Sequence, residues 1–323
     1  MTTDREIVVT RLVDAPRELV FRAFTEPQHV IHWWGPFGFK TTISEMQVRD
    51  GGVWRFTMHG PDGTDYPNEI RYLEVVPNER LVIKHGTGRE GDVGFDATFT
   101  FATEGSKTRV TIRQLHASAA RATEVKKYAV DGGNQTLTRM EGFVETMRER
   151  LQSSTLEGAT SDEADFVITR VFDAPRALLF KVMTEPEHLG KWFGPKGMDL
   201  RVVSSSLRPG GEFRYAMKAG PNELFGKFVY REVTAPTRLV YVVSFTDDAG
   251  RPVRHPMSPT WPLEVLTINS LAELGNKTVF FGRSIPIRTT DEERQTFRAG
   301  HSGMVGGFKG TYDQLEGYLK TLV

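Results

Sequence analysis

The sequence contains one unit twice. Residues 7–39 align with residues 166–198 at an offset of 159 residues, and about half of the paired positions are identical. Both copies read Thr-Arg-x-x-Asp-Ala-Pro-Arg, then Thr-Glu-Pro, then Trp-x-Gly-Pro-x-Gly, and the likeness continues to Arg80-Leu81-Val82 and Arg238-Leu239-Val240. Solenoid repeats are only about 20 to 50 residues long and cannot bury a core alone. A repeat of this greater length predicts two domains that each fold by themselves.

The sequence predicts a first domain over residues 1–152, a linker over residues 153–164 and a second domain over residues 165–323. The proposed linker is made of small and polar residues without a hydrophobic period, a composition typical of flexible connections. A duplicated surface can pack on its own copy, so one interpretation is that the two domains form a pseudo-dimer.

Composition argues against several classes of function. Lysine and arginine together number 41, as do aspartate and glutamate, so the chain lacks the excess positive charge that nucleic-acid binding uses. The chain has no cysteine, which excludes disulfides, thiolate catalysis and cysteine-bound metals. We see no apolar signal sequence and no stretch of about 20 apolar residues. The expectation is a cytoplasmic protein without membrane insertion or nucleic-acid partners.

The local pattern predicts an α+β fold. Alternating apolar and polar residues indicate antiparallel strands over 40–48, 53–59, 68–76, 81–85, 95–102 and 108–115, with counterparts in the second copy. Asp-Ala-Pro predicts the start of a helix after the first strand, capped by the aspartate. Thr25 and Thr184 are each followed three residues later by Gln or Glu, the spacing of a capping box, which predicts a second short helix there. Apolar residues spaced three and four apart predict a long closing helix in each copy, through Leu137–Leu151 and Met304–Leu322.

This order of elements resembles the helix-grip fold of the START-like (SRPBCC) superfamily, a curved antiparallel sheet around a long C-terminal helix. The Asp-Ala-Pro-Arg, Thr-Glu-Pro, Trp-Phe-Gly-Pro and Gly-Gly-x-Phe elements are similar to the family named for the activator of the heat-shock protein 90 ATPase. The resemblance covers nearly all of the second copy, whereas the first departs from it at residues 131–135. It implies a cavity between sheet and helix in each domain.

Aromatic and sulfur-containing side chains gather where such a cavity would lie, and they predict a site for a hydrophobic or aromatic small molecule. Each of these residues also fits an ordinary core. The predicted lining consists of Trp33, Trp34, Phe37, Trp54, Phe56, Met58, His85 and Met140 in the first domain, and of Trp192, Phe193, Phe213, Tyr215, Met217, Trp261, His301, Met304 and Phe308 in the second.

Two glycine patterns allow more than one interpretation. The last helix carries glycines at 300, 303, 306, 307, 310 and 317, which either open the mouth of a cavity or allow close approach of helix and sheet. Residues 86–91 match the dinucleotide pattern Gly-x-Gly-x-x-Gly. A strand-like segment follows it instead of a helix, so we interpret it as a hairpin connection.

Polar residues leave the chemistry open. No metal-binding spacing and no nucleophile-elbow motif occurs, so we predict no metal and no cofactor, and no catalytic residue can be assigned. Ligand binding or sequestration is the leading hypothesis; a cyclase or hydrolase activity in one cavity and a regulator of a chaperone ATPase are the alternatives. The remaining polar candidates are His59, Tyr66, His85 and His116, and in the second copy Tyr230, His255, Glu264, Arg283 and His301.

Overall fold

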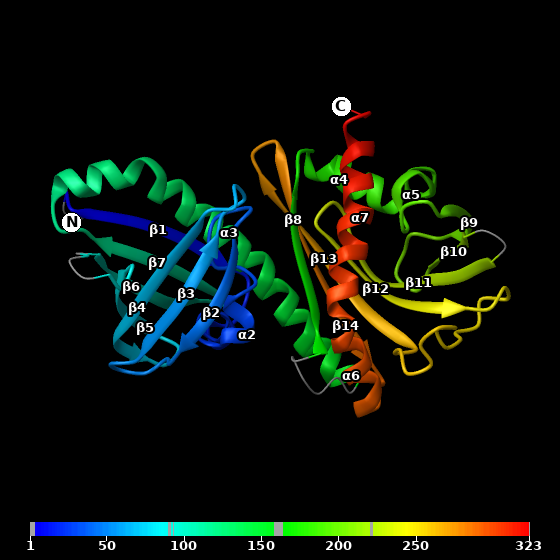
Figure 1. Cartoon of the computed structure of the whole chain (residues 1–323), viewed down its shortest axis with the longest axis horizontal. Coiled ribbons are helices and arrows are strands. Elements are labelled where there is room, and N and C mark those ends of the chain that lie inside the picture. Colours follow the sequence, from blue (N-terminus) through cyan, green and yellow to red (C-terminus); the bar gives the residue numbers. More distant parts are fainter. Residues whose placement is uncertain (1–3, 90–91, 93, 158–163, 220–221, 323) are drawn as a thin grey trace. The chain divides into compact units, whose positions relative to one another are not determined.

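The computed structural model describes residues 4–89, 92, 94–157, 164–219 and 222–322. The chain divides into two compact units, Met1–Arg148 and Glu149–Val323, here called the first and the second domain. Each is an α+β helix-grip domain in which the last helix lies along a single antiparallel sheet (Figure 1). Among the described residues, no helix combines the length and the apolar character needed to cross a membrane.

In the first domain a strand and two short helices precede six successive strands and the long helix. The order is β1 (Glu6–Val13), α1 (Arg17–Thr25), α2 (Pro27–Val30), β2 (Lys40–Met46), β3 (Val53–His59), β4 (Asp65–Val76), β5 (Arg80–Gly86), β6 (Phe95–Glu104), β7 (Lys107–Leu115) and α3 (Ala119–Glu157). The strands lie in the order β1-β7-β6-β5-β4-β3-β2. The helix α3 continues into the segment predicted as a linker, of which residues 158–163 lie outside the described residues.

The second domain repeats this arrangement with a divided closing helix. Its elements are β8 (Phe166–Phe172), α4 (Arg176–Thr184), α5 (Pro186–Trp192), β9 (Asp199–Ser205), β10 (Glu212–Ala219), β11 (Asn222–Thr234), β12 (Arg238–Thr246), β13 (Glu264–Leu274), β14 (Lys277–Ile287), α6 (Asp291–Ala299) and α7 (His301–Leu319). The strand order β8-β14-β13-β12-β11-β10-β9 matches that of the first domain.

The predicted caps of the short helices are wrong. Helix α1 has Pro16 as its N-cap, and Asp14 instead accepts a hydrogen bond from Arg148 Nη1 at 2.9 Å. Neither α2 nor α5 has a side-chain cap, because Thr25 and Thr184 donate back to the carbonyl oxygens of the preceding helical turn. The capping box lies elsewhere, at the start of α6: Thr290 Oγ1 accepts from the backbone N–H of Glu293.

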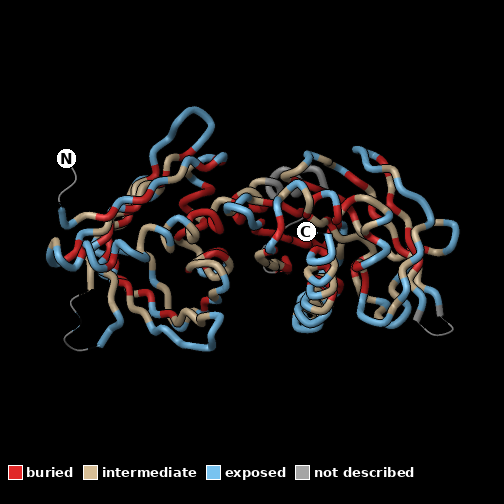
Figure 2. Tube along the Cα trace, turned by 90° about the horizontal axis from the view of Figure 1, so that it is seen from above, coloured by how far each residue is buried: buried red, intermediate tan, exposed pale blue. Residues whose placement is uncertain are grey.

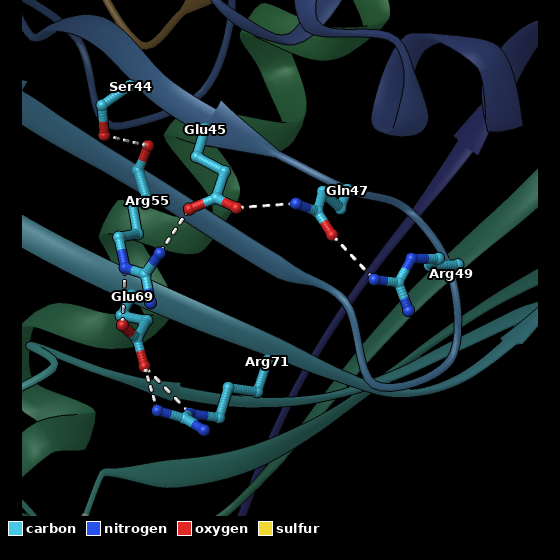
Figure 3. Close-up of polar contacts among 7 residues, drawn as sticks. All are labelled: Ser44, Glu45, Gln47, Arg49, Arg55, Glu69 and Arg71. Carbon is cyan, nitrogen blue, oxygen red and sulfur yellow. Dashed lines mark hydrogen bonds and ion pairs between the residues drawn. The ribbon is translucent and has the colours of Figure 1, made fainter.

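The outer face of the first sheet is polar. Arg55 on β3 binds Glu45 on β2 and Glu69 on β4, the latter at 2.9 Å, and Arg71 extends the row (Figure 3). Exposed ion pairs of this kind add little to the free energy of folding. Buried and exposed positions alternate along the strands (Figure 2), so the apolar residues face the side that carries the helices.

Candidate functional site

Most of the aromatic residues predicted to line a cavity in the first domain pack against one another. Trp33 is buried and its Nε1–H donates to the Ala23 carbonyl oxygen at 3.0 Å. The rings of Trp34 and Trp54 lie 4.8 Å apart, and those of Trp54 and Phe56 lie 4.4 Å apart. The space left beside them is about 10 Å³, room for about one water molecule at most. This part of the interior is packed as a core.

A larger hollow of about 490 Å³ lies at one end of the same domain. The end of β5, the start of β6 and the first turns of α3 surround it, and we call it the His85 hollow. It is lined by Asn68, His85, Gly86, Thr87, Asp92, Gly94, Phe95, His116, Ala117, Arg121, Val125 and Tyr128. A smaller hollow of about 170 Å³ lies beside the same connection and shares His85, Gly86, Asp92 and Gly94 with it.

His85 is the polar group best placed to meet a molecule in this hollow. Its ring stacks on Phe95, with centroids 4.8 Å apart and an interplanar angle of 19°. Among the residues that the structure describes, neither ring nitrogen of His85 has a hydrogen-bond partner. Burial lowers the pKa of His85 to about 4, against the opposing effect of the Asp92 carboxylate. The imidazole is therefore neutral at pH 7 and offers one donor and one acceptor.

His116 lies on the other side of Phe95, and their ring centroids are 5.2 Å apart. Its side chain is buried, and burial lowers its pKa, with a smaller contribution from the Arg121 cation. Its backbone is held by Arg5, whose Nε–H donates to the His116 carbonyl oxygen at 2.8 Å. His85, Phe95 and His116 thus form one row of rings along the hollow.

The connection between β5 and β6 forms one wall of the hollow. Because these strands pair antiparallel, the Gly-x-Gly-x-x-Gly segment is part of a hairpin connection, as predicted. Asp92 accepts hydrogen bonds from Thr87 and from the backbone N–H of Gly94, and these bonds lower the pKa of its carboxyl group. Residues 90, 91 and 93 lie outside the described residues.

The opposite wall is the beginning of α3, which the sequence did not predict. Ser118 Oγ accepts from the backbone N–H of Arg121 at 3.2 Å and so caps the helix. Val125 is buried against the hollow, and Tyr128 is 60% exposed. Arg121 forms an ion pair with Glu124 at 2.7 Å, so its charge is partly compensated.

The remaining candidates of the first domain lie away from the His85 hollow. The Phe37 backbone N–H donates to Gln135 at 3.1 Å, and Met140 is fully buried in α3. Met58 lies beside Gly35, so the Gly-Pro turn packs on β3. His59 pairs with Asp65 at 2.6 Å, and Tyr66 is exposed.

In the second domain the equivalent aromatic residues also form a core. Trp192 donates to the Val182 carbonyl oxygen at 3.0 Å, as Trp33 does to Ala23. Phe193 and Phe213 have their ring centroids 5.5 and 5.6 Å from that of Tyr215, and Met217 packs on the same cluster. Unlike the first core, this one contains several tyrosines and an amide.

These tyrosines include the buried Tyr230, and burial raises the pKa of each above its usual value. Tyr241 accepts a hydrogen bond from Asn269 Nδ2 at 3.2 Å, and its pKa is raised to about 12. They are therefore protonated at neutral pH.

The predicted residues near α6 and α7 surround Trp261. Its ring centroid lies 5.1 Å from that of Phe297 and 6.4 Å from that of His255. His301 packs on Phe297, and its Nε2 lies 3.2 Å from the Ala164 carbonyl oxygen. Burial lowers the pKa of both His255 and His301. Met304 is half-buried.

Other polar candidates of the second domain already have partners. Arg283 lies 3.2 Å from Asp165 in a pair whose side chains are each 2% exposed, and Glu264 binds Arg288 at 2.6 Å. Phe308 stacks on Phe166 with centroids 5.5 Å apart.

Close approach to the sheet does not explain most glycines of the last helix. A Cβ atom at Gly303, Gly306, Gly307 or Gly310 would meet nothing within 4 Å, so these glycines are not required for close packing. Gly303, Gly306 and Gly307 are exposed and Gly310 is partly buried, all in the first half of α7. Gly300 alone fits the close-packing interpretation, because a Cβ there would lie 2.8 Å from Trp261.

One group of side chains in the described part of the chain has metal-ligand types close together. Single ligand atoms of Glu185, Glu187 and His188 lie within 4.8 Å of one another. His188 Nδ1 is 2.8 Å from the Tyr318 hydroxyl, so this histidine has a structural contact, and we assign no function to the group.

Comparison with known proteins places the chain in a family. The model of the family described as Activator of Hsp90 ATPase homolog 1-like protein matches residues 14–145 and 173–320. A search of curated proteins gave no match.

Many solved structures are similar. A Nitrosomonas europaea protein is 23% identical with a TM-score of 0.42, over 46% of this chain and 99% of that one. A Chromobacterium violaceum protein is 30% identical with a TM-score of 0.38, over 43% and 97%. The di-domain ARO/CYC BexL from the BE-7585A biosynthetic pathway is 14% identical with a TM-score of 0.37, over 97% and 98%. Since the family model matches most of both domains, the chain belongs to the Activator of Hsp90 ATPase homolog 1-like family and carries its domain twice.

Proposed function

We propose that the first domain binds a small, mainly apolar molecule in the His85 hollow. The volume of about 490 Å³ falls in the range of about 300 to 1,000 Å³ that is usual for ligand sites. The lining combines apolar side chains such as Phe95 and Val125 with about as many polar ones, among them the charged Asp92 and Arg121. In such sites the apolar groups bind and the polar groups orient a ligand.

One observation carries this proposal: His85 lies in the hollow without a hydrogen-bond partner among the described residues. His85 is partly buried, whereas the Nε2 atom of His116 in the same hollow is fully buried and also has no partner among the described residues. Leaving a buried polar atom without a partner costs about 1 to 3 kcal/mol. A ligand with a hydroxyl or N–H group can supply that partner. Because the imidazole is neutral at pH 7, and because the charged lining residues Asp92 and Arg121 already bind Thr87 and Glu124, the hollow favours a neutral ligand over a charged one.

The test is calorimetric titration of the full chain with indole, a flat molecule with one N–H group. We expect saturable binding that is lost in Val125→Trp, whose larger side chain fills the hollow. Leu73→Trp is the matched control, because Leu73 is 54% exposed and does not line the hollow. Thermal melting verifies that both variants fold. Equal indole binding by Val125→Trp and the wild type would contradict the proposal.

A further inference from the structure

The sheet of the second domain carries apolar residues where the first carries its histidines. Arg80 and Arg238 start β5 and β12, and each binds a glutamate of the preceding strand. Five residues after these arginines stand His85 and Val243. His85 is paired with Phe95 across the ladder, and Val243 is paired with Val265.

The next strand pair extends the comparison. Asp96 is paired with Leu115, and its counterpart Leu266 is paired with Ile285. The residue that follows Leu115 is His116, and the one that follows Ile285 is Pro286. The row His85, Phe95, His116 therefore corresponds to Val243, Val265, Pro286.

The helices can be compared through their caps. Ser118 Oγ accepts from the backbone N–H three residues on, and Thr290 Oγ1 does the same at the start of α6. Counting seven residues from each cap gives Val125 and Phe297, and counting ten gives Tyr128 and Gly300. Val125 and Tyr128 are the two helix positions that line the His85 hollow beyond its first turn.

Trp261 covers the corresponding two positions in the second domain. Its ring lies 5.1 Å from that of Phe297, and its Cζ3 atom lies 2.8 Å from where a Cβ of Gly300 would be. The absence of a side chain at Gly300 gives the indole ring its room.

The segment between β12 and β13 that carries Trp261 is fastened to α6. Thr296 Oγ1 donates to Thr260 Oγ1 at 2.9 Å, and Arg254 binds both Glu293 and the Trp261 carbonyl oxygen, the latter at 3.2 Å. The indole ring is thus held in place by this chain's own contacts.

We infer that Trp261 occupies, in the second domain, the place that the ligand occupies in the first. The second domain is closed at this end by its own indole ring, and the ligand of the first domain is a flat aromatic molecule of about two fused rings. The polar group of that ligand faces His85. This inference rests on the proposed function of the His85 hollow, whose size and lining it uses to define the ligand class.

The experiment counts binding sites in the full chain by calorimetry with indole and with indene, which has the same shape but no N–H group. The wild type should bind one indole. Trp261→Ala should bind two, because the emptied place in the second domain accepts the ring that was removed, as apolar cavities do. Trp261→Ala combined with Val125→Trp should again bind one. Indole should also raise the melting temperature of Trp261→Ala.

The two sites should differ in selectivity. The site of the wild type should prefer indole to indene by about tenfold, the worth of one hydrogen bond, and His85→Phe should remove that preference. The site opened by Trp261→Ala should bind both molecules equally, since Val243 replaces His85 there and the neighbouring His255 and His301 already bond to the Met257 N–H and the Ala164 carbonyl oxygen. Trp261→Leu, which keeps an apolar contact with Phe297, gives a smaller opening and serves if the alanine variant does not fold.

The outcomes separate the inference from the proposed function. If the wild type and Trp261→Ala each bind one indole, and Val125→Trp removes that site from both, the inference is overturned and the proposed function stands. No site in the wild type and one in Trp261→Ala would refute the proposed function, while still supporting Trp261 as the filler of an aromatic site. A wild-type site without preference for indole would overturn the role given to His85.

Discussion

Replacing Gly306 and Gly307 by alanine should stabilise the second domain. Both lie within α7 and a Cβ at either position would meet nothing within 4 Å. Glycine in the interior of a helix costs up to about 1 kcal/mol relative to alanine, mainly through backbone entropy. With no steric cost to subtract, the double variant should gain about 1 to 2 kcal/mol in the free energy of unfolding.

That gain has a measurable size. In a domain of 150 to 250 residues, 1 kcal/mol corresponds to about 2 to 4 °C in melting temperature. Differential scanning calorimetry should therefore move the transition of the second domain upward by about 2 to 8 °C and leave that of the first domain unchanged. Gly300→Ala is the control, because its Cβ would collide with Trp261, and it should lower the same transition. An unchanged or lower transition in the double variant would refute the reasoning.

Three further predictions concern the first domain and a shared buried contact. In the folded protein the pKa of His85 is about 4, below the ordinary 6.5. Keeping the neutral imidazole buried therefore adds on the order of 2 to 3 kcal/mol to the free energy of unfolding above pH 6.5, and this stabilisation is lost as the pH falls from 6.5 towards 4. His85→Phe should flatten that part of a pH series of urea melts. Thr108→Val and Thr278→Val remove equivalent buried hydrogen bonds of 2.7 Å to Ala15 and Ala174, and each should cost about 1 to 3 kcal/mol in chemical denaturation. Arg139→Met removes three bonds to the carbonyl oxygens of His32, Gly35 and Pro36 and should cost at least about 3 kcal/mol; a loss below about 1 kcal/mol by the same assay would show that water replaces the guanidinium.

The sequence predicts the architecture well because its signals are local. The alternation through Trp54, Phe56 and Met58 predicts β3, and the predicted bounds 53–59 are those of the structure. The repeat then transfers each such assignment to the second copy. The caps failed because two local hydrogen bonds compete for one hydroxyl. Thr25 Oγ1 can accept from an N–H of the next helix or donate to the Phe21 carbonyl oxygen, and in the structure it donates to Phe21.

The site was less accessible to sequence reasoning. The first turns of α3 are mostly polar, with Lys126 and Lys127 exposed, so they lack the apolar period that reveals a packed helix. The capping pattern Ser118-Ala119-Ala120-Arg121 was a faint signal. His85 and His116 were singled out, but only the pairing of β5, β6 and β7 brings them to the two sides of Phe95.

Trp261 illustrates a different difficulty. An aromatic side chain in a long insertion has no periodic pattern around it. Its residue type alone therefore favours lining a ligand cavity and filling the core equally. Its position against Gly300 becomes visible only once the helix is placed.

The pair of Asp165 and Arg283 has a practical consequence. Asp165 stands immediately before the first strand of the second domain, yet its carboxylate lies in the interior beside the guanidinium. If that domain were expressed separately from Phe166 onward, Arg283 would keep its burial and lose this carboxylate, and removing one member of a buried ion pair typically costs about 3 to 5 kcal/mol. The shortest autonomous version of the domain therefore has to include Asp165, although the sheet begins one residue later.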